Sequence, residues 1–309
     1  MWFLFALCTT VAWGASDLFY KKGADASDRY SHLKTAMIVG FVMGLHAVLT
    51  LCVTGMPYDP VNLLLHLPVS LLYILSMTVG YFGLRYLQLS VSSPVQNSSG
   101  AVTCILCLLL LGQSMDALSA VGVALICAGV FALGLLERKS EARVIVAAER
   151  KYAFSFTAFL LPVAYCVIDA LGTFFDAYYL DSVETTPLSG VTADTLENTA
   201  NVSYELTFLL CAVLILLYLL LVRRERIAIR AQRDRGIAAL LETAGQATYV
   251  YALSGNGAVA APLIASYSIV SLLLSRIFLK EKLGVWEYAV IAAVIAGVAL
   301  LGLAEGLAG

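Results

Sequence analysis

An apolar helical hairpin that occurs twice constrains the fold of this chain more than any other sequence feature. Residues 94–137 align without a gap with residues 262–305, and about 13 of the 44 aligned positions are identical. The identical residues include Pro94 and Pro262, the Ala-Gly-Val runs at 128–130 and 296–298, and Glu137 and Glu305. We interpret this similarity as an internal duplication.

Each copy consists of two apolar spans joined by a short polar turn, at 112–116 in the first copy and 280–282 in the second. A bilayer accommodates such a hairpin, because helices satisfy their own backbone groups while apolar side chains face lipid. The whole chain is 61% hydrophobic and 13% charged, with a mean hydropathy of +0.88. This composition excludes a soluble protein and predicts an integral, multi-pass membrane protein.

Apolar runs long enough to cross a membrane predict an all-α protein with ten transmembrane helices. They lie at about 2–21, 34–54, 63–88, 94–112, 117–136, 153–180, 204–222, 236–254, 258–279 and 285–305. A polar segment divides them, which predicts a five-helix repeat at 1–137, a cytoplasmic linker at 138–152 and a second five-helix repeat at 153–309. No basic segment precedes the first run, so we expect it to be retained as a helix.

The distribution of basic residues predicts the orientation of these helices. Lys and Arg gather in the first, fifth, seventh and ninth connections, near 21–34, 138–151, 223–235 and 280–282. The positive-inside rule places these connections in the cytoplasm and both termini outside. We expect the protein to lie in the plasma (inner) membrane. An odd number of helices per half makes the two repeats insert in opposite directions, which predicts an inverted repeat of the kind found in many transporters.

Two aspartates occupy matching positions in the first helix of each half. Asp17 shares a helix face with Trp13, and Asp169 shares one with Tyr165. An aromatic ring one turn from a carboxylate suits a bound ammonium group. Asp17 has a second interpretation, an ion pair with Lys21 one turn away. Asp169 has no cation within reach on its own helix, whereas Asp176 lies near the outer end and is expected to be solvated.

Further polar residues within the apolar runs are candidates for substrate binding, because charge inside a membrane needs a partner or a function. Glu242, Gln246 and Tyr249 share one helix face, and Glu242 can bind substrate or a proton or, near a helix start, be solvated. Tyr81 and Arg85 share another face, where Arg85 can hold a substrate carboxylate or pair with an internal acid. Four more candidates follow Pro94 and Pro262, where they either contact ligand or join helices: Gln96, Asn97, Ser266 and Tyr267.

Other polar and sulfur-containing residues have structural interpretations. Gly40 and Gly44 are spaced for close helix packing, and His46 is interpreted as a hydrogen-bonded core residue. The pair Cys104 and Cys107 has no second ligand pair, so we expect no metal and no cofactor. No basic patch with interleaved aromatics predicts a nucleic-acid partner. The acidic connection at 181–201 is interpreted as a solvated linker.

The chain resembles the EamA-type transporters of the drug/metabolite transporter superfamily. The resemblance rests on ten spans in two halves, Trp13-Gly14 in the first helix, the two early prolines, the hairpin turns and the Ala-Gly-Val runs. It covers nearly the full chain, although Gln113 stands where the turn often has Glu and the sixth connection is unusually long. It implies a ten-helix fold and a transport function, with substrates that include amino acids, choline and nucleotide sugars.

These observations favour a secondary transporter of a small polar metabolite, such as an amino acid or a choline-like amine, by alternating access. The expected partners are that substrate, the lipid bilayer and a coupling proton or exchanged solute, in a monomer or homodimer. A receptor or scaffold without transport is the first alternative. An intramembrane aspartyl enzyme is the second, but the Gly-x-Gly-Asp signature of such proteases is absent; we expect no catalytic residues.

Overall fold

The computed structural model describes residues 1–25, 27–83, 96, 98–148, 156–225, 227–280 and 283–308, and these form helices and no strand. The helices of the first half are α1 (Trp2–Gly23), α2 (Ser31–Thr54), α3 (Asn62–Leu65), α4 (Leu67–Gly83), α6 (Ser99–Leu110) and α7 (Ala117–Ala148). Those of the second half are α8 (Phe156–Tyr179), α9 (Leu196–Leu217), α10 (Arg233–Leu253), α11 (Gly257–Ala265), α12 (Tyr267–Leu274) and α13 (Val285–Ala308). Two short π turns extend α9 and α12: η1 (Tyr218–Val222) and η3 (Ser275–Leu279). A 3₁₀ turn, η2 (Ile229–Gln232), precedes α10.

Seven of the described helical segments are long and apolar enough to cross a membrane, which confirms an integral, multi-pass membrane protein. They are Trp2–Gly23, Ser31–Thr54, Ala117–Leu136, Leu160–Tyr179, Leu196–Val222, Gly257–Leu279 and Val285–Leu307. The helices α4 and α6 are apolar but shorter. The described segments therefore correspond to seven of the ten predicted crossings.

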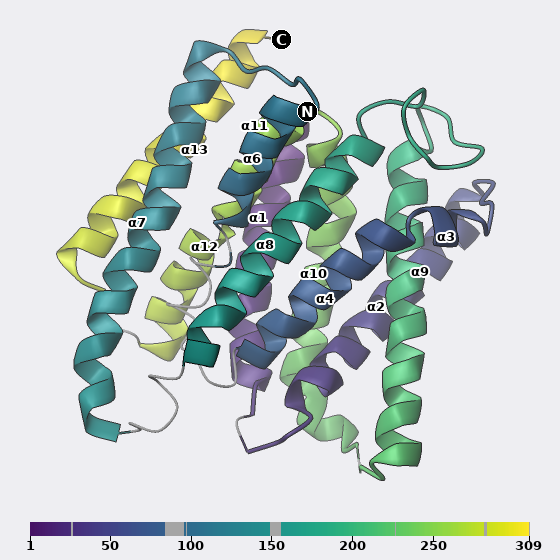
Figure 1. The fold of residues 1–309 in the computed structure, drawn as a ribbon, viewed down its shortest axis with the longest axis horizontal. Coiled ribbons are helices and arrows are strands. Elements are labelled where there is room, and N and C mark those ends of the chain that lie inside the picture. Colours follow the sequence, from purple (N-terminus) through teal and green to yellow (C-terminus); the bar gives the residue numbers. More distant parts are fainter. Residues whose placement is uncertain are drawn as a thin grey trace.

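The helices pack in pairs that join the two halves of the chain. The main pairs are α1 with α10, α2 with α9, α4 with α8, α6 with α11, and α7 with α13. In Figure 1 the α7–α13 pair forms one edge of the bundle and the α2–α9 pair the opposite edge. Both chain termini lie at the same end of the bundle (Figure 1), where the Met1 amino group bonds the Glu305 carboxylate. Each half is therefore incomplete without the other.

Small residues allow the backbones of several pairs to approach closely. A Cβ on Gly40 would lie 2.5 Å from the Phe208 carbonyl oxygen of α9, and one on Gly44 would lie 2.6 Å from Leu209 Cβ. In the α7–α13 pair, a Cβ on Gly122 would lie 2.9 Å from the Gly297 carbonyl oxygen. The predicted packing role of Gly40 and Gly44 is confirmed.

The segment 257–279 is the most buried of the long apolar segments and lies at the centre of the bundle. The sequence predicts one continuous helix here, but the structure divides it into α11 and α12 at Ser266. The Ser266 hydroxyl donates to the Leu263 carbonyl oxygen at 2.6 Å, which satisfies a backbone group near the end of α11. The interruption places Tyr267 at the start of a new helix in the middle of the bundle.

Candidate functional site

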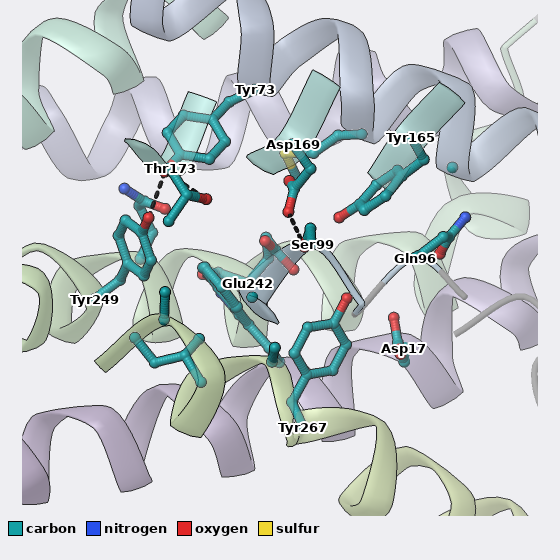
Figure 2. Close-up of a pocket in the computed structure, with 18 of the residues that line it drawn as sticks. Asp17, Tyr73, Gln96, Ser99, Tyr165, Asp169, Thr173, Glu242, Tyr249 and Tyr267 are labelled. Carbon is teal, nitrogen blue, oxygen red and sulfur yellow. Dashed lines mark hydrogen bonds between the residues drawn. The ribbon is translucent and has the colours of Figure 1, made fainter. Parts of the chain in front are cut away.

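A central cavity lies where helices of both halves meet (Figure 2). Its walls come from α1, α4 and α6 of the first half and from α8, α9, α10, α11 and α12 of the second. About 870 Å³ of space lies among the lining side chains, counting the part that is open to solvent.

Aromatic side chains form much of the cavity wall. They are Trp13 and seven tyrosines: Tyr20, Tyr73, Tyr81, Tyr165, Tyr204, Tyr249 and Tyr267. Such rings offer apolar faces that attract cations, together with hydroxyl groups that form hydrogen bonds. The wall therefore suits an amphipathic or positively charged organic molecule.

Trp13 is fixed in the cavity wall by contacts with α10 and α12. Its ring stacks on Tyr249 with centroids 5.1 Å apart and meets Tyr267 edge-on at 6.0 Å. Its Nε1 donates to the Glu242 carbonyl oxygen at 3.2 Å. The ring lies so close to Gly245 that a Cβ there would be 2.3 Å from Trp13 Cδ1. A glycine at 245 is thus needed for this ring position.

Three carboxylic side chains line the same cavity: Asp17, Asp169 and Glu242. Asp169 Oδ2 accepts from the Ser99 hydroxyl at 2.8 Å (Figure 2), and its Oδ1 accepts from the Ser76 hydroxyl at 3.2 Å. Because each donor is a neutral hydroxyl, these bonds position Asp169 without neutralising a negative charge on it.

The other two acids are held in a similar way. Ser271 donates to Asp17 Oδ2 at 2.8 Å, and Ser16 donates to Glu242 Oε2 at 3.1 Å. Of the residues that the structure describes, no Lys or Arg lines the cavity. The described wall is therefore acidic and aromatic.

Two hydrogen-bonded tyrosine contacts lie in the cavity wall. Tyr73, Thr173 and Tyr249 lie together at one side in Figure 2, away from Asp17 and Gln96. The Tyr73 hydroxyl bonds the Tyr249 hydroxyl and donates to Thr173 Oγ1 at 3.2 Å. In the second contact, the Tyr81 hydroxyl donates to Tyr20 at 3.1 Å. The helix α4 contributes a tyrosine to both contacts, and the partners are Tyr249 of α10 and Tyr20 of α1.

The structure brings most of the predicted site residues together. The residues that line the cavity are Trp13, Asp17, Tyr81, Gln96, Tyr165, Asp169, Glu242, Gln246, Tyr249 and Tyr267. Ser266 does not line it, because its hydroxyl turns back to its own helix. Arg85 and Asn97 lie outside the described residues. The interpretation of Glu242 as a solvated first-turn residue is wrong, since α10 begins at Arg233 and buries it.

Sequence reasoning missed several lining residues, among them Tyr20, Tyr73, Met77, Ser99 and Tyr204. Tyr20 shares the helix face of Trp13 and Asp17. Tyr73 and Met77 precede Tyr81 at intervals of four residues, so helical periodicity could have indicated all three of these missed residues. Tyr204 and Ser99 carry no such signal. Their position depends on which helices meet.

Two polar pairs lie outside the cavity. His46 Nδ1 lies 2.8 Å from Glu205 Oε2 between α2 and α9, which confirms that His46 is hydrogen-bonded. It is not a core residue, because 36% of its side chain is exposed. His66 Nε2 lies 3.3 Å from Asp176 Oδ1, and His66 Nδ1 lies 2.9 Å from the Ser70 hydroxyl. The expectation that Asp176 is solvated is wrong, because only 2% of the residue is exposed and His66 covers it.

Metal ligands do not gather in the described part of the chain, where no three His, Cys, Asp or Glu residues are placed to share an ion. Cys104 and Cys107 are both buried free thiols on α6. The polar groups that do converge are therefore those of the central cavity.

Comparison with solved structures supports the fold. A crystal structure described only as "Crystal structure of protein" is similar over 99% of this chain and 98% of its own chain, with a TM-score of 0.65 and 14% sequence identity. At this identity the likeness establishes the fold alone. No curated protein matches the sequence.

The family comparison covers most of the chain and confirms the resemblance that the sequence motifs indicate. The model of the EamA-like transporter family matches residues 1–135 and 185–303. The protein therefore belongs to the EamA-like transporter family.

Proposed function

We propose that the protein is a secondary transporter that moves a small, amine-bearing metabolite across the membrane by alternating access. The observation that carries this proposal is the central cavity, whose described wall combines three acids with eight aromatic rings and holds no Lys or Arg. A cationic or zwitterionic amine, such as an amino acid or a choline-like compound, complements such a wall. The family membership supports transport as the activity.

The binding mode follows from the groups that converge on the middle of the cavity. Asp169 supplies negative charge, and Tyr165 and Tyr267 lie near it (Figure 2). Trp13 lines the same cavity and meets Tyr267 edge-on. An ammonium group between a carboxylate and aromatic rings gains both charge pairing and cation–π attraction, which contributes about 0.5–2 kcal/mol per ring contact. Gln96 and Gln246 offer amides for the carboxylate of a zwitterion.

Glu242 is our candidate for the coupling proton site. Its carboxylate faces the same cavity as Asp169 and receives a hydrogen bond from Ser16. Since the two acids face one cavity, an arriving cation favours loss of a proton from either of them. This linkage would let proton movement drive, or exchange with, substrate movement.

Alternating access requires two halves that move against one another around the cavity. We propose ten crossings arranged as two inverted five-helix repeats, with the termini outside the plasma membrane. The helix pairs support this arrangement: exchanging the equivalent helices of the two halves turns α1–α10 into α8–α4 and leaves α2–α9, α6–α11 and α7–α13 unchanged. We propose that the Tyr73–Tyr249 and Tyr81–Tyr20 contacts close opposite ends of the cavity and open in turn.

A thermal-shift screen tests this proposal, because a ligand that binds only the folded protein stabilises it by mass action. Purified protein would be heated with matched sets of quaternary amines, primary amines, amino acids, carboxylic acids and sugar nucleotides. We expect amines and amino acids to raise the unfolding temperature, and carboxylic acids without an amine to leave it unchanged.

Compounds that bind would then be tested for flux in proteoliposomes. Uptake above that of protein-free vesicles supports transport. Binding without flux in sealed vesicles would instead indicate a receptor, and stabilisation only by anions would contradict the proposed substrate class.

A further inference from the structure

A second cavity, on the surface, lies at the end of the bundle where α1 connects to α2 and α9 ends. It is lined by Arg29, Tyr30, Leu33, Phe82, Tyr218 and Arg223, together with His32. The ends of α2 and α9 that form it lie side by side (Figure 1). Two arginines, two tyrosines and the apolar side chains of Leu33 and Phe82 thus meet at one surface site, and none of its residues lines the central cavity.

Arg223 is held in a defined position at this site. Its guanidinium lies over the rings of Tyr218 and Tyr30, at 5.2 and 5.6 Å from their centroids. Its Nε donates to the Tyr218 hydroxyl at 2.6 Å. The two terminal nitrogens remain as a planar pair of donors, which matches the oxygens of a phosphate group. Arg29 adds a second positive charge beside Tyr30, at 5.8 Å from the ring.

The acidic residues that neighbour these arginines in the sequence are already paired with another residue. Asp28 and Glu225 both pair with the buried Lys34, at 2.9 and 3.2 Å. Across the part of the chain that the structure describes, no carboxylate forms an ion pair with Arg223. The surface cavity therefore keeps a positive charge that suits an anion.

The residues around the site indicate a position at the boundary between lipid tails and headgroups. Leu221 and Val222 come directly before Arg223 and are 71% and 65% exposed, as expected for side chains that face lipid tails. Tyrosine is typical of the boundary between tails and headgroups, and both Tyr30 and Tyr218 lie in this cavity. An anion at this place is in contact with the membrane surface.

We propose that this surface cavity binds the phosphate of an anionic phospholipid. Arg223 forms a paired hydrogen bond with the phosphate oxygens, Arg29 adds charge attraction, and the lipid tails follow the exposed side chains at the end of α9. The site anchors the connection between α1 and α2 to one leaflet of the membrane.

Titration with a fluorescent phosphatidylglycerol tests the proposal on the full-length protein in detergent. We expect saturable binding, competition by unlabelled phosphatidylglycerol, and weaker competition by phosphatidylcholine with the same tails. Arg223→Gln should weaken binding about fivefold, since one basic residue near a membrane surface contributes about 1 kcal/mol. Arg223→Lys should recover only part of the loss, because lysine keeps the charge without the planar pair of donors.

Arg224→Gln is the matched control, because it removes the same charge from the next residue, which does not line the cavity. We expect it to retain binding. Equal losses in Arg224→Gln and Arg223→Gln would overturn the proposal, and so would displacement of the lipid by an equal concentration of inorganic phosphate. Should Arg223→Gln not fold, Tyr218→Phe keeps the ring but removes the bond to Nε; roughly threefold weaker binding supports the proposal, and unchanged binding contradicts it.

Discussion

The α7–α13 pair and the central cavity are built from different kinds of residue, although both join the two halves of the chain. In the α7–α13 pair, glycines bring two backbones together: a Cβ on Gly297 would lie 2.8 Å from the Gly122 carbonyl oxygen, and one on Gly129 would lie 2.3 Å from Val294 Cγ2. Its outer side chains, such as Phe131 and Leu303, are exposed as lipid-facing residues are. The cavity instead gathers acids, tyrosines and the amides of Gln96 and Gln246.

The duplication is easier to recognise in the sequence of the α7–α13 pair than in that of the cavity helices. The Ala-Gly-Val runs that align in the two halves belong to α7 and α13, where backbone contact demands small residues. The cavity helices repeat an aspartate at Asp17 and Asp169, but Glu242 has Ile74 at the position that the hairpin's alignment offset would give it. The repeat is most similar where it packs, and it differs where the proposed substrate binds.

Filling the α7–α13 contact should have the largest effect on stability. Gly297→Val places new atoms against the α7 backbone, so we expect a loss of about 1–3 kcal/mol in the free energy of unfolding. Thermal unfolding in detergent measures it. Gly306→Val on the same helix is the control, because nothing lies within 4 Å of a Cβ there. Equal unfolding temperatures in the two variants would show that this contact does not hold the halves together.

A change in the cavity wall should affect binding more than folding. Gly245→Ala forces the Trp13 ring to move, which disrupts its stacking on Tyr249 and its bond to Glu242. We expect the affinity for an amine ligand to fall about tenfold, because a desolvated cation–π contact is worth up to about 2 kcal/mol. Ligand titration by thermal shift measures it. Gly236→Ala, on the same helix in open space, should leave affinity unchanged.

The two tyrosine contacts in the cavity wall should contribute modestly and independently. Tyr73→Phe removes the bonds to Tyr249 and Thr173, and Tyr81→Phe removes the bond to Tyr20. We expect each to cost about 0.5–1.5 kcal/mol of unfolding free energy. The double variant should show additive losses, since separate contacts do not couple. A strongly non-additive loss of unfolding free energy in the double variant would mean that the Tyr73 and Tyr81 contacts are energetically coupled.

The smallest effect should come from the start of α7. Asp116 accepts backbone hydrogen bonds from Ser119 and Leu118 and one from the Ser119 hydroxyl, and these bonds hold the pKa of its carboxyl below the usual range. A lowered folded-state pKa stabilises the protein above the ordinary aspartate pKa of about 3.9, and this stabilisation is lost as the pH falls through the lowered value.

Asp116→Ala should therefore lower the unfolding temperature slightly near neutral pH. The difference from the unchanged protein should shrink as the pH falls below about 4. Unfolding temperatures measured across pH 3–7 test this. A difference that is constant over the whole range would exclude the charged carboxylate as its source.

Sequence periodicity predicted much of the site, because each helix presents one face. The faces that contain Asp17, Asp169 and Glu242 were recognisable from aromatic and acidic residues one turn apart. Their convergence in one cavity was expected from the resemblance to transporters rather than from spacing. Tyr204 and Ser99 were missed because their role depends on the pairing of helices, which a single helix's pattern does not contain.

Local reasoning failed where distant residues supply hydrogen bonds. Asp176 was expected to be solvated from its place near a helix end, but His66, which lies between α3 and α4, covers it. The interruption at Ser266 was also missed, because the surrounding residues are apolar enough for one continuous helix. At Asp176 a residue from a distant part of the chain supplies the contact that water would have supplied, whereas at Ser266 the hydroxyl bonds the nearby Leu263 carbonyl oxygen.

Substrate flux through Asp169→Asn tests the central claim most directly. Asparagine keeps the size and much of the hydrogen bonding with Ser76 and Ser99 but removes the negative charge. In proteoliposomes that contain equal amounts of folded protein, we predict that uptake of an amine identified by the thermal-shift screen falls to the level of protein-free vesicles. Uptake at the rate of the unchanged protein would contradict the assignment of the cavity as the transport site.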